Sequence, residues 1–142
     1  MATIPFVVEI PRNQHGGNIP GAYIVTWGPL ANGDDGAPFV CPNKSDKSVQ
    51  VLGTFGAGGN ARIEGSNKQA YNTSLSGGAS AGLGASDYAT LNDPQANALD
   101  FTSAKIEQVL ENPNAIRPRV TAGDGTTSLT VVMTVTATQL AF

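Results

Sequence analysis

The last residues of the chain, Ala122 to Phe142, read AGDGTTSLTVVMTVTATQLAF and decide the fold class. After a Gly-Asp-Gly turn, aliphatic residues alternate with threonines. The aliphatic positions are Leu129, Val131, Met133, Val135 and Ala137, and the alternate positions are Thr130, Val132, Thr134, Thr136 and Thr138. Because successive side chains of a strand point to opposite faces, the pattern predicts a long strand with one face in a core. Three readings remain for the threonine-rich face, which a second sheet, solvent or a partner molecule would cover.

The composition extends this reading to the whole chain. The chain has 142 residues, of which 40% are hydrophobic and only 13% are charged, with 17 glycines and nine prolines. This length suits one domain, and low charge with abundant Gly, Pro and Thr favours short strands joined by turns. We therefore expect a single all-β domain over residues 1–142, a β-sandwich or jelly roll with at most one short helix. The Pro- and Gly-rich start of the chain makes residues 1–20 a candidate extended arm.

Period-two patterns and turn residues divide the chain into expected elements. Gly56 to Gly59 separates two alternating runs and predicts a hairpin, in which Ala61 and Ile63 point inward. A Gly/Ala/Ser-rich stretch, residues 73–86, is expected to be a flexible surface loop. The helical spacing of Ile106, Val109 and Leu110 predicts a short helix over 102–112. The expected strands are residues 6–10, 22–27, 38–40, 48–52, 60–64, 87–91, 98–101, 116–121 and the final run.

Charge and composition also bear on the possible partners. The net charge is −3, and the sequence contains no run of Lys or Arg, so we expect no binding to nucleic acid. The N-terminus lacks the basic region of a signal peptide, and no apolar stretch reaches the length of a membrane span. We therefore expect synthesis in a cytoplasm and no membrane partner. One cysteine and one histidine exclude an intramolecular disulfide and a Cys/His zinc cage within one chain, and we expect no metal or cofactor.

Several residues only resemble parts of a catalytic or ligand site. The stretch Gly56 to Ala61 matches a dinucleotide fingerprint, but the alternation that follows favours a turn over the required helix. His15 lies in a Gly/Pro loop and reads as a solvated residue. Asp34 and Asp35 lie in an NGDDG turn, where turn chemistry is favoured over a Ca²⁺ site. Cys41 has no sequence-adjacent base and reads as a small buried hydrophobe. We therefore expect no catalytic residues and no enzyme activity.

Some residues are candidates for contacts with a partner. Arg117 and Arg119 fall on one face of a strand, either solvated or forming salt bridges to a partner. Trp27 is read as core, with an interface anchor as the alternative. The candidate contact residues, for a capsid or for other copies of the chain, are Phe6, Val8, Arg12, Trp27, Arg117, Arg119, Thr130, Val132 and Thr134.

Several stretches are similar to the small head-decoration, or cement, proteins of tailed bacteriophages, in particular short-tailed ones. The similarity is carried by AYIVTWGPLANGDDGAPF (22–39), KSVQVLGTFGAGGNARIEGSN (47–67) and YATLNDPQANALDFTSAKIEQVLENPNAIRPRVTAGDGTTSLTVVM (88–133). The resemblance implies a jelly-roll protein on the outer surface of the virion that clamps the major capsid protein. It implies no catalytic motif. The Gly/Ala/Ser loop over 73–86 departs from the short turn that the resemblance leads us to expect.

Two functions follow as expectations. The first is a structural virion protein that binds the outside of a phage capsid, stabilises contacts between major capsid protein subunits and meets other copies of itself, with a dimer as the default state. The alternative is a carbohydrate-binding β-sandwich for host adhesion, which would need exposed aromatic side chains. Among the tyrosines, only Tyr71 lies clearly in a loop, and this disfavours the alternative.

Overall fold

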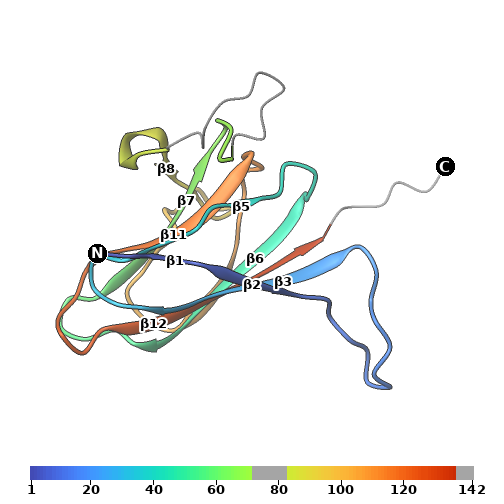
Figure 1. Ribbon diagram of the computed structural model, residues 1–142, viewed down its shortest axis with the longest axis horizontal. Helices are drawn as coiled ribbons and strands as arrows, with labels where there is room; N and C mark the ends of the chain where they lie inside the picture. Colours follow the sequence, from blue (N-terminus) through green and yellow to red (C-terminus); the bar gives the residue numbers. More distant parts are fainter. Residues whose placement is uncertain (72–82, 137–142) are drawn as a thin grey trace.

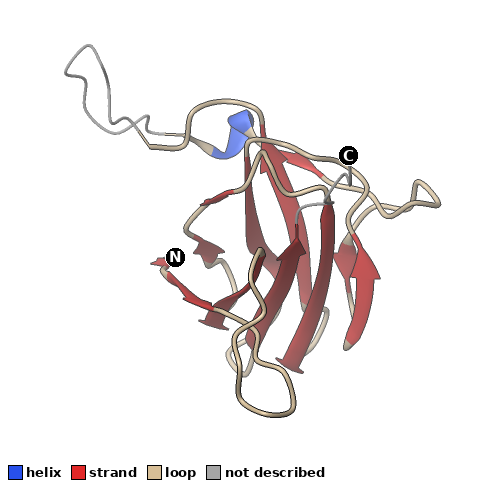
Figure 2. Cartoon of the chain, turned by 90° about the vertical axis from the view of Figure 1, so that its right-hand side faces the viewer, coloured by secondary structure: helices blue, strands red, loops and turns tan. Residues whose placement is uncertain are grey.

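The computed structural model describes residues 1–71 and 83–136, which fold into two β-sheets packed face to face (Figure 1, Figure 2). The expected all-β sandwich is confirmed. The one helical element in these ranges is a single 3₁₀ turn, η1 (Ala85–Asp87). Most of the expected loop over 73–86 falls on residues 72–82, outside the described residues.

The first sheet, sheet A, follows the order β1-β4-β11-β7-β8, with β5 also paired to β11 and β9 to β7. Its long central strands are antiparallel, and the others are two-residue segments along their edges. The bounds are β1 (Thr3–Ile4), β4 (Asp35–Gly36), β5 (Phe39–Val40), β7 (Asn60–Ser66), β8 (Ala89–Thr90), β9 (Asp100–Phe101) and β11 (Ala115–Ala122).

The second sheet, sheet B, has five strands in the order β10-β6-β12-β3-β2. The bounds are β2 (Phe6–Glu9), β3 (Ala22–Leu30), β6 (Asp46–Thr54), β10 (Lys105–Gln108) and β12 (Ser128–Thr136). The strand expected from the C-terminal alternation is β12, which lies in the centre between β3 and β6. Its inward side chains point at sheet A and are 0% exposed: Leu129, Val131, Met133 and Val135. Ala137 and Thr138 lie outside the described residues.

The hydrophobic core fills the space between the sheets. Both sheets contribute their alternating inward positions, which is the packing expected of an aligned sandwich. Among the described residues, every buried side-chain nitrogen and oxygen has a hydrogen-bond partner. The largest fully buried apolar side chains are Val25, Trp27, Leu30, Val49, Val51, Ile63, Phe101, Val109, Ile116, Leu129 and Met133.

The helix expected over 102–112 is wrong, because this segment contains strand β10. Lys105 to Gln108 pair with residues 51 to 48 of β6, and Val109 continues the ladder by donating its N–H to the carbonyl of Lys47. The open edge of β6 supplies backbone partners for residues 105–109, which outweighs the weak helical spacing of the segment. Only Val109 of the helical triplet is buried, whereas Ile106 and Leu110 are 59% and 51% exposed.

The hairpin expected around Gly56 is also wrong, although the turn itself is present. Strand β6 belongs to sheet B and β7 to sheet A, so the turn carries the chain from one sheet to the other. Gly56 has φ +74°, and a Cβ there would lie 2.3 Å from a carboxylate oxygen of Asp124. Ala61 and Ile63 point inward as expected. The dinucleotide-like stretch runs directly into β7 rather than into a helix.

The N-terminal segment is not an extended arm over its whole expected length. Strand β1 pairs with β4 in sheet A, and β2 pairs with β3 in sheet B, so residues 3–9 bridge the two sheets. The connection from β2 to β3, residues 10–21, leaves the body and is called the finger below (Figure 1). Within it, Arg12 and Asn18 form an isolated β-bridge, and the backbone of Ile19 donates to Pro11 at 2.8 Å.

Candidate functional site: two exposed surfaces

The outward side chains of sheet B form a surface that we call the threonine face. It is centred on Val132, whose register partners on either side are Gln50 and Thr26. The same row extends to Ile106 on β10 and to Val7 on β2. The parallel row through Thr134 contains Gln108, Ser48, Ile24 and Glu9. The candidate contact residues Thr130, Val132 and Thr134 therefore lie together on one face.

Few charges and several exposed aliphatic side chains distinguish the threonine face. Val7 is 63% exposed, Ile106 59% and Leu52 39%, while Val132 is half-buried among its neighbours. In the outward rows, which pass through Thr130, Val132, Thr134 and Thr136, the charged side chains are Glu9 and Asp46, both near the margin. The two sheets meet through their other faces, so no third layer of the described chain covers this face. A second sheet therefore does not cover the threonines of β12, and the two readings left for this face are solvent and a partner molecule.

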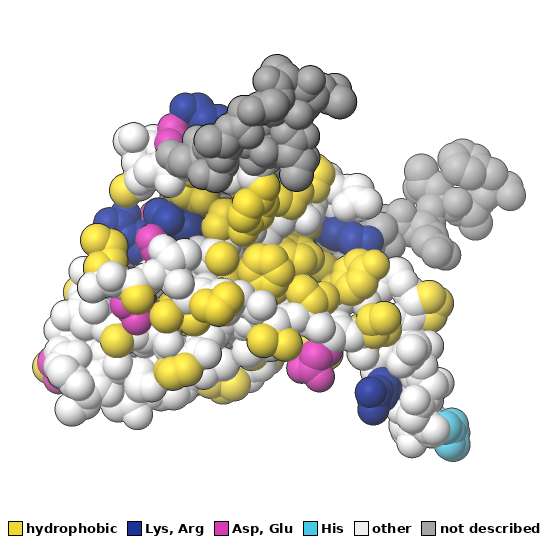
Figure 3. Space-filling view, viewed as in Figure 1, with side chains coloured by type: hydrophobic (Ala, Val, Ile, Leu, Met, Phe, Trp, Pro, Cys, Tyr) yellow, Lys and Arg dark blue, Asp and Glu magenta, His cyan; other side chains and the backbone are white. Residues whose placement is uncertain are grey.

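A second surface, the apolar seam, lies on the side of the sandwich where the N-terminal segment passes from sheet A to sheet B. Hydrophobic side chains gather there between β5 and the β2–β3 pair (Figure 3). Four of them are partly buried and pack against the core, while Val8 is 42% exposed. The apolar seam consists of Ile4, Phe6, Val8, Tyr23 and Phe39.

An aromatic cluster fixes the middle of the seam. The ring of Phe6 meets the rings of Trp27 and Phe39 edge-on, with centroids 6.2 and 5.4 Å away. Trp27 is 1% exposed, and its indole N–H donates to the carbonyl of Ala37 at 2.8 Å. The interface-anchor alternative for Trp27 is therefore wrong, because the strands around it leave no surface for a partner to reach. Phe6 and Val8 are accessible from this side, whereas Trp27 supports them from within.

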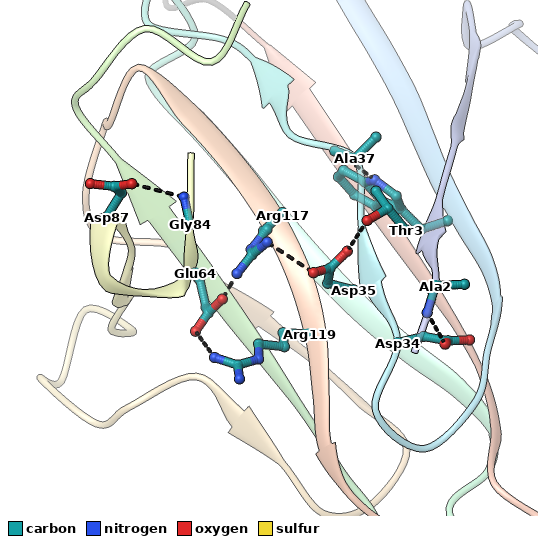
Figure 4. A network of polar contacts seen from close by, with 11 residues as sticks. Ala2, Thr3, Asp34, Asp35, Ala37, Glu64, Gly84, Asp87, Arg117 and Arg119 are labelled. Atoms are coloured by element: carbon teal, nitrogen blue, oxygen red, sulfur yellow. Dashed lines mark hydrogen bonds and ion pairs between the residues drawn. The ribbon is translucent and has the colours of Figure 1, made fainter. Parts of the chain in front are cut away.

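The outer side of sheet A is occupied by charged residues that pair with one another (Figure 4). The Arg117 guanidinium contacts Glu64 Oε1 through Nε and Asp35 Oδ2 through Nη1, each at 3.1 Å. The ring of Tyr88 covers it at 3.8 Å. Arg119 Nη1 lies 3.8 Å from Glu64 Oε2. Both open readings for Arg117 are wrong: its side chain is 8% exposed and its ion pairs are internal.

The two aspartates of the NGDDG turn hold the N-terminus. Asp34 accepts hydrogen bonds from the backbone of Ala2 at 2.8 Å and Ala31 at 2.9 Å. Asp35 accepts a hydrogen bond from the hydroxyl group of Thr3 at 2.7 Å, in addition to its ion pair with Arg117 (Figure 4). The turn-chemistry reading is confirmed for Asp34, which bonds within the turn to Ala31, whereas Asp35 lies in β4 and binds residues remote in sequence. In residues 1–71 and 83–136, no three His, Cys, Asp or Glu side chains are grouped so as to hold a metal ion.

The cysteine belongs to the hydrophobic core. Cys41 is 2% exposed, and burial raises the pKa of its thiol, against a smaller lowering by Lys47 and Lys44. The ammonium group of Lys47 is itself buried and donates to the carbonyl of Lys44 at 2.8 Å and to the side chain of Asn112. Desolvation lowers the pKa of Lys47. The reading of Cys41 as a buried hydrophobe is confirmed.

The aromatic residue suited to stacking on a sugar is Tyr71, which is 45% exposed. It lines a shallow hollow with Thr3, Asp35, Tyr88 and Arg117. Its hydroxyl donates to the carbonyl of Pro38 at 2.9 Å, and the polar groups of Thr3, Asp35 and Arg117 already pair inside the chain. The hollow therefore provides an aromatic ring, but the polar groups beside this ring are already hydrogen-bonded or ion-paired within the chain.

The structure separates the candidate contact residues that the sequence analysis brought forward. Thr130, Val132 and Thr134 share the threonine face, and Phe6 and Val8 share the apolar seam. Arg12 lies on the finger, Trp27 in the core, and Arg117 and Arg119 in the charged cluster of sheet A. Sequence analysis missed Val7, Leu52 and Ile106. The mistaken helix concealed Ile106, and no sequence pattern singled out Val7 or Leu52.

Comparison of the chain with protein-family models, with curated proteins and with solved structures finds no match. Within the described residues, no helix has the length and hydropathy needed to span a bilayer.

Proposed function

We propose that this protein is a structural virion protein that binds the outside of a tailed-phage capsid and stabilises contacts between major capsid protein subunits. One observation supports this proposal most directly. The threonine face, which carries few charges, and the apolar seam lie on different sides of a single sandwich, and no strand of the described chain covers either of them. A protein that fastens neighbouring subunits together needs this property, because it must contact more than one body at once.

The chemistry of the two surfaces suits a permanent interface. The cores of stable interfaces are depleted in charged residues and contain well-packed apolar side chains. Burying Val132, Val7 and Ile106 removes apolar area from water, at about 25 cal/mol per Å². Threonine and glutamine side chains between them can donate and accept hydrogen bonds. No lysine or arginine on the rows through Val132 and Thr134 would have to be desolvated without a partner.

The proposed mechanism is mass action on a closed shell. A ligand that binds only the assembled state stabilises that state in proportion to its free concentration over its dissociation constant. Many copies, each held weakly, then add up around the shell. The sandwich contributes rigidity, since its described buried polar groups are satisfied internally and its core is continuous between the sheets. The resemblance expected from the stretches at 22–39, 47–67 and 88–133 leads to the same proposal, although the comparisons with known proteins find no match.

The experiment is co-sedimentation of the purified protein with shells of its parent phage that lack it. The protein is titrated to saturation, and copies per shell are counted by quantitative gel densitometry. We expect saturable binding at a fixed ratio to the major capsid protein and a raised thermal transition of the decorated shell. A chain unfolded by heating and rapidly cooled serves as the control for non-specific trapping.

Absence of saturable binding to expanded shells would contradict the proposal. A glycan array with intrinsic Tyr and Trp fluorescence as the readout would then test the carbohydrate-binding alternative. Quenching upon binding of a sugar, lost in Tyr71→Ala, would support that function instead.

A further inference from the structure

The N-terminal segment, residues 2–9, is held by a part of the chain that lies beyond the finger. Strand β1 pairs with residues 35 and 36, and β2 with residues 24 to 27. The hydrogen bonds of Ala2 and Thr3 run to Asp34 and Asp35, and the ring of Phe6 meets Trp27 and Phe39. The strand pairings, hydrogen bonds and ring contacts of the segment named above thus all run to residues 24–39.

The segment occupies the edge of both sheets. β1 ends the strand order of sheet A, and β2 ends that of sheet B. Its inward anchors are Ile4 and Phe6, whereas Val7, Val8 and Ile10 are 63%, 42% and 46% exposed. Because no strand of the described chain lies on its outer side, the segment can leave without disturbing another ladder. The site that it would vacate is an open edge on each sheet with an aromatic pocket between them.

The finger that tethers the segment is much longer than this pairing requires. Antiparallel neighbours are usually joined by about two to five residues, whereas residues 10–21 separate β2 from β3. All of these residues except Pro11 are exposed. The finger is closed by local bonds, such as Asn13 N–H to Gly17 O at 2.7 Å and Ile19 N–H to Pro11 O at 2.8 Å. If the finger opens, its dozen residues can span an end-to-end distance of about 40 Å. This distance is about the diameter of a domain of this size.

From these three observations we infer that residues 2–9 are an exchangeable element whose second binding site is the vacated 24–39 edge of another copy of this chain. In the exchanged pair, each copy receives the same strand pairings and ring contacts that it gives up. Only the finger changes conformation, from a closed loop to a linker between two bodies. Such reciprocal exchange is a low-cost route to a dimer.

Concentration decides between the closed and the exchanged form. The closed form keeps the local bonds of the finger and loses no translational freedom, so it prevails in dilute solution. Copies held side by side on a surface face effective concentrations of about 1 mM, at which the exchanged form competes. This inference does not depend on the proposed function, since it requires only two copies of the chain.

The test uses cysteines at Val7 and Thr26, which are direct register partners of β2 and β3 on the exposed threonine face. Val7→Cys and Thr26→Cys are made separately, both with Cys41→Ala. The two are mixed at about 1 mM, opened with a pulse of denaturant, refolded and oxidised, and the disulfide-linked peptides are identified by mass spectrometry. We expect a mixed disulfide between positions 7 and 26, at least tenfold above its level in the same mixture without the pulse.

The matched control is Ser48→Cys mixed with Thr134→Cys. These two positions are also register partners on the threonine face, but both lie in the body that exchange leaves intact. A 7–26 disulfide no more abundant than the 48–134 disulfide would overturn the inference. A parallel measurement uses the native chain, whose mass is followed by light scattering after the same pulse. If this chain is monomeric at every concentration up to about 1 mM, the inference is overturned even if the cysteine variants fold poorly.

Discussion

The guanidinium of Arg117 lies 3.1 Å from the carboxylate of Asp35, which is 82 positions earlier in the chain. This contact joins the central strand β11 of sheet A to the turn that receives the N-terminus. Asp35 binds Thr3 with its other oxygen, and Glu64 binds the second arm of the same guanidinium. One buried arginine therefore ties together three segments that are remote in sequence. The cluster has a structural role, because its charges are turned toward one another.

Removal of Arg117 is expected to cost far more stability than removal of Arg119. Arg117→Ala leaves Asp35 without its cation and leaves Glu64 with only the more distant Arg119, and breaking a buried pair in this way costs about 3–5 kcal/mol. Arg119 is 34% exposed and lies 3.8 Å from Glu64, so Arg119→Ala should cost less than about 1 kcal/mol. Urea unfolding followed by tryptophan fluorescence measures both. The two residues are two positions apart on the same strand and the same face. Equal losses of unfolding free energy in the two variants would therefore contradict the buried-pair explanation.

The N-terminal segment is expected to contribute to stability rather than only to attachment. Phe6→Ala removes a half-buried ring from its contacts with Trp27 and Phe39, for a loss of about 2 kcal/mol, below the range for fully buried phenylalanine. Val7→Ala, the adjacent position on the opposite face, should change the free energy of unfolding by less than about 0.5 kcal/mol. Chemical unfolding of both variants provides the measurement. A larger loss for Val7→Ala than for Phe6→Ala would show that β2 is not seated as described.

Asp124 is expected to make stability depend on pH at the acid end. Hydrogen bonds from the Thr126 side chain and from the backbone of Ala57 and Thr126 lower the pKa of Asp124 to about 2, from 3.8. A carboxylate whose pKa is depressed in the folded state stabilises that state above the unfolded value. The contribution is therefore present above pH 3.8 and is lost as the pH falls toward about 2. Melting temperatures of the native chain and Asp124→Asn should differ at pH 5 and converge near pH 2.

The control for this pH dependence is Glu9→Gln, which removes an exposed carboxylate on β2. Its melting curve should stay parallel to that of the native chain over the same range. If the gap between the native chain and Asp124→Asn persists unchanged at pH 2, the turn around Asp124 does not depend on its charge.

Local patterns predicted the core of the fold well. The alternation of β12 was sufficient because a central strand between two neighbours has every inward side chain buried, as Val131 and Met133 are. The same reasoning placed Ala61 and Ile63 correctly. Pairing was harder to predict, since a turn such as Gly56 to Gly59 looks the same whether it closes a hairpin or crosses between sheets. The helix expected over 102–112 failed for a related reason, because the backbone partner of that segment, β6, is remote in sequence.

Sequence patterns identified only some of the residues that form the candidate surfaces. Thr130, Val132 and Thr134 were identifiable because they share one strand and one face. Their neighbours Val7 and Ile106 belong to strands whose register with β12 no local pattern encodes. Trp27 and Arg117 were misplaced as possible contacts because side chains from distant segments, Phe6 and Glu64 among them, bury or neutralise them. Apolar side chains on a surface become meaningful only when the topology shows that they are neighbours.

The last prediction concerns attachment to the shell. Val132→Lys and Val8→Lys each place a strongly hydrated cation on one of the two surfaces, the threonine face and the apolar seam respectively. If either surface is buried against the shell, the charge must be desolvated without a partner, and we expect a loss of at least tenfold in affinity, about 1.4 kcal/mol.

Gln95→Lys in the exposed turn between β8 and β9 adds the same charge elsewhere and should bind like the native chain. Co-sedimentation with undecorated shells measures all three, and melting temperatures confirm that each variant is folded. A tenfold loss in one surface variant alone would assign the contact to that side of the sandwich. Unchanged binding of both would exclude the two surfaces as the points of attachment.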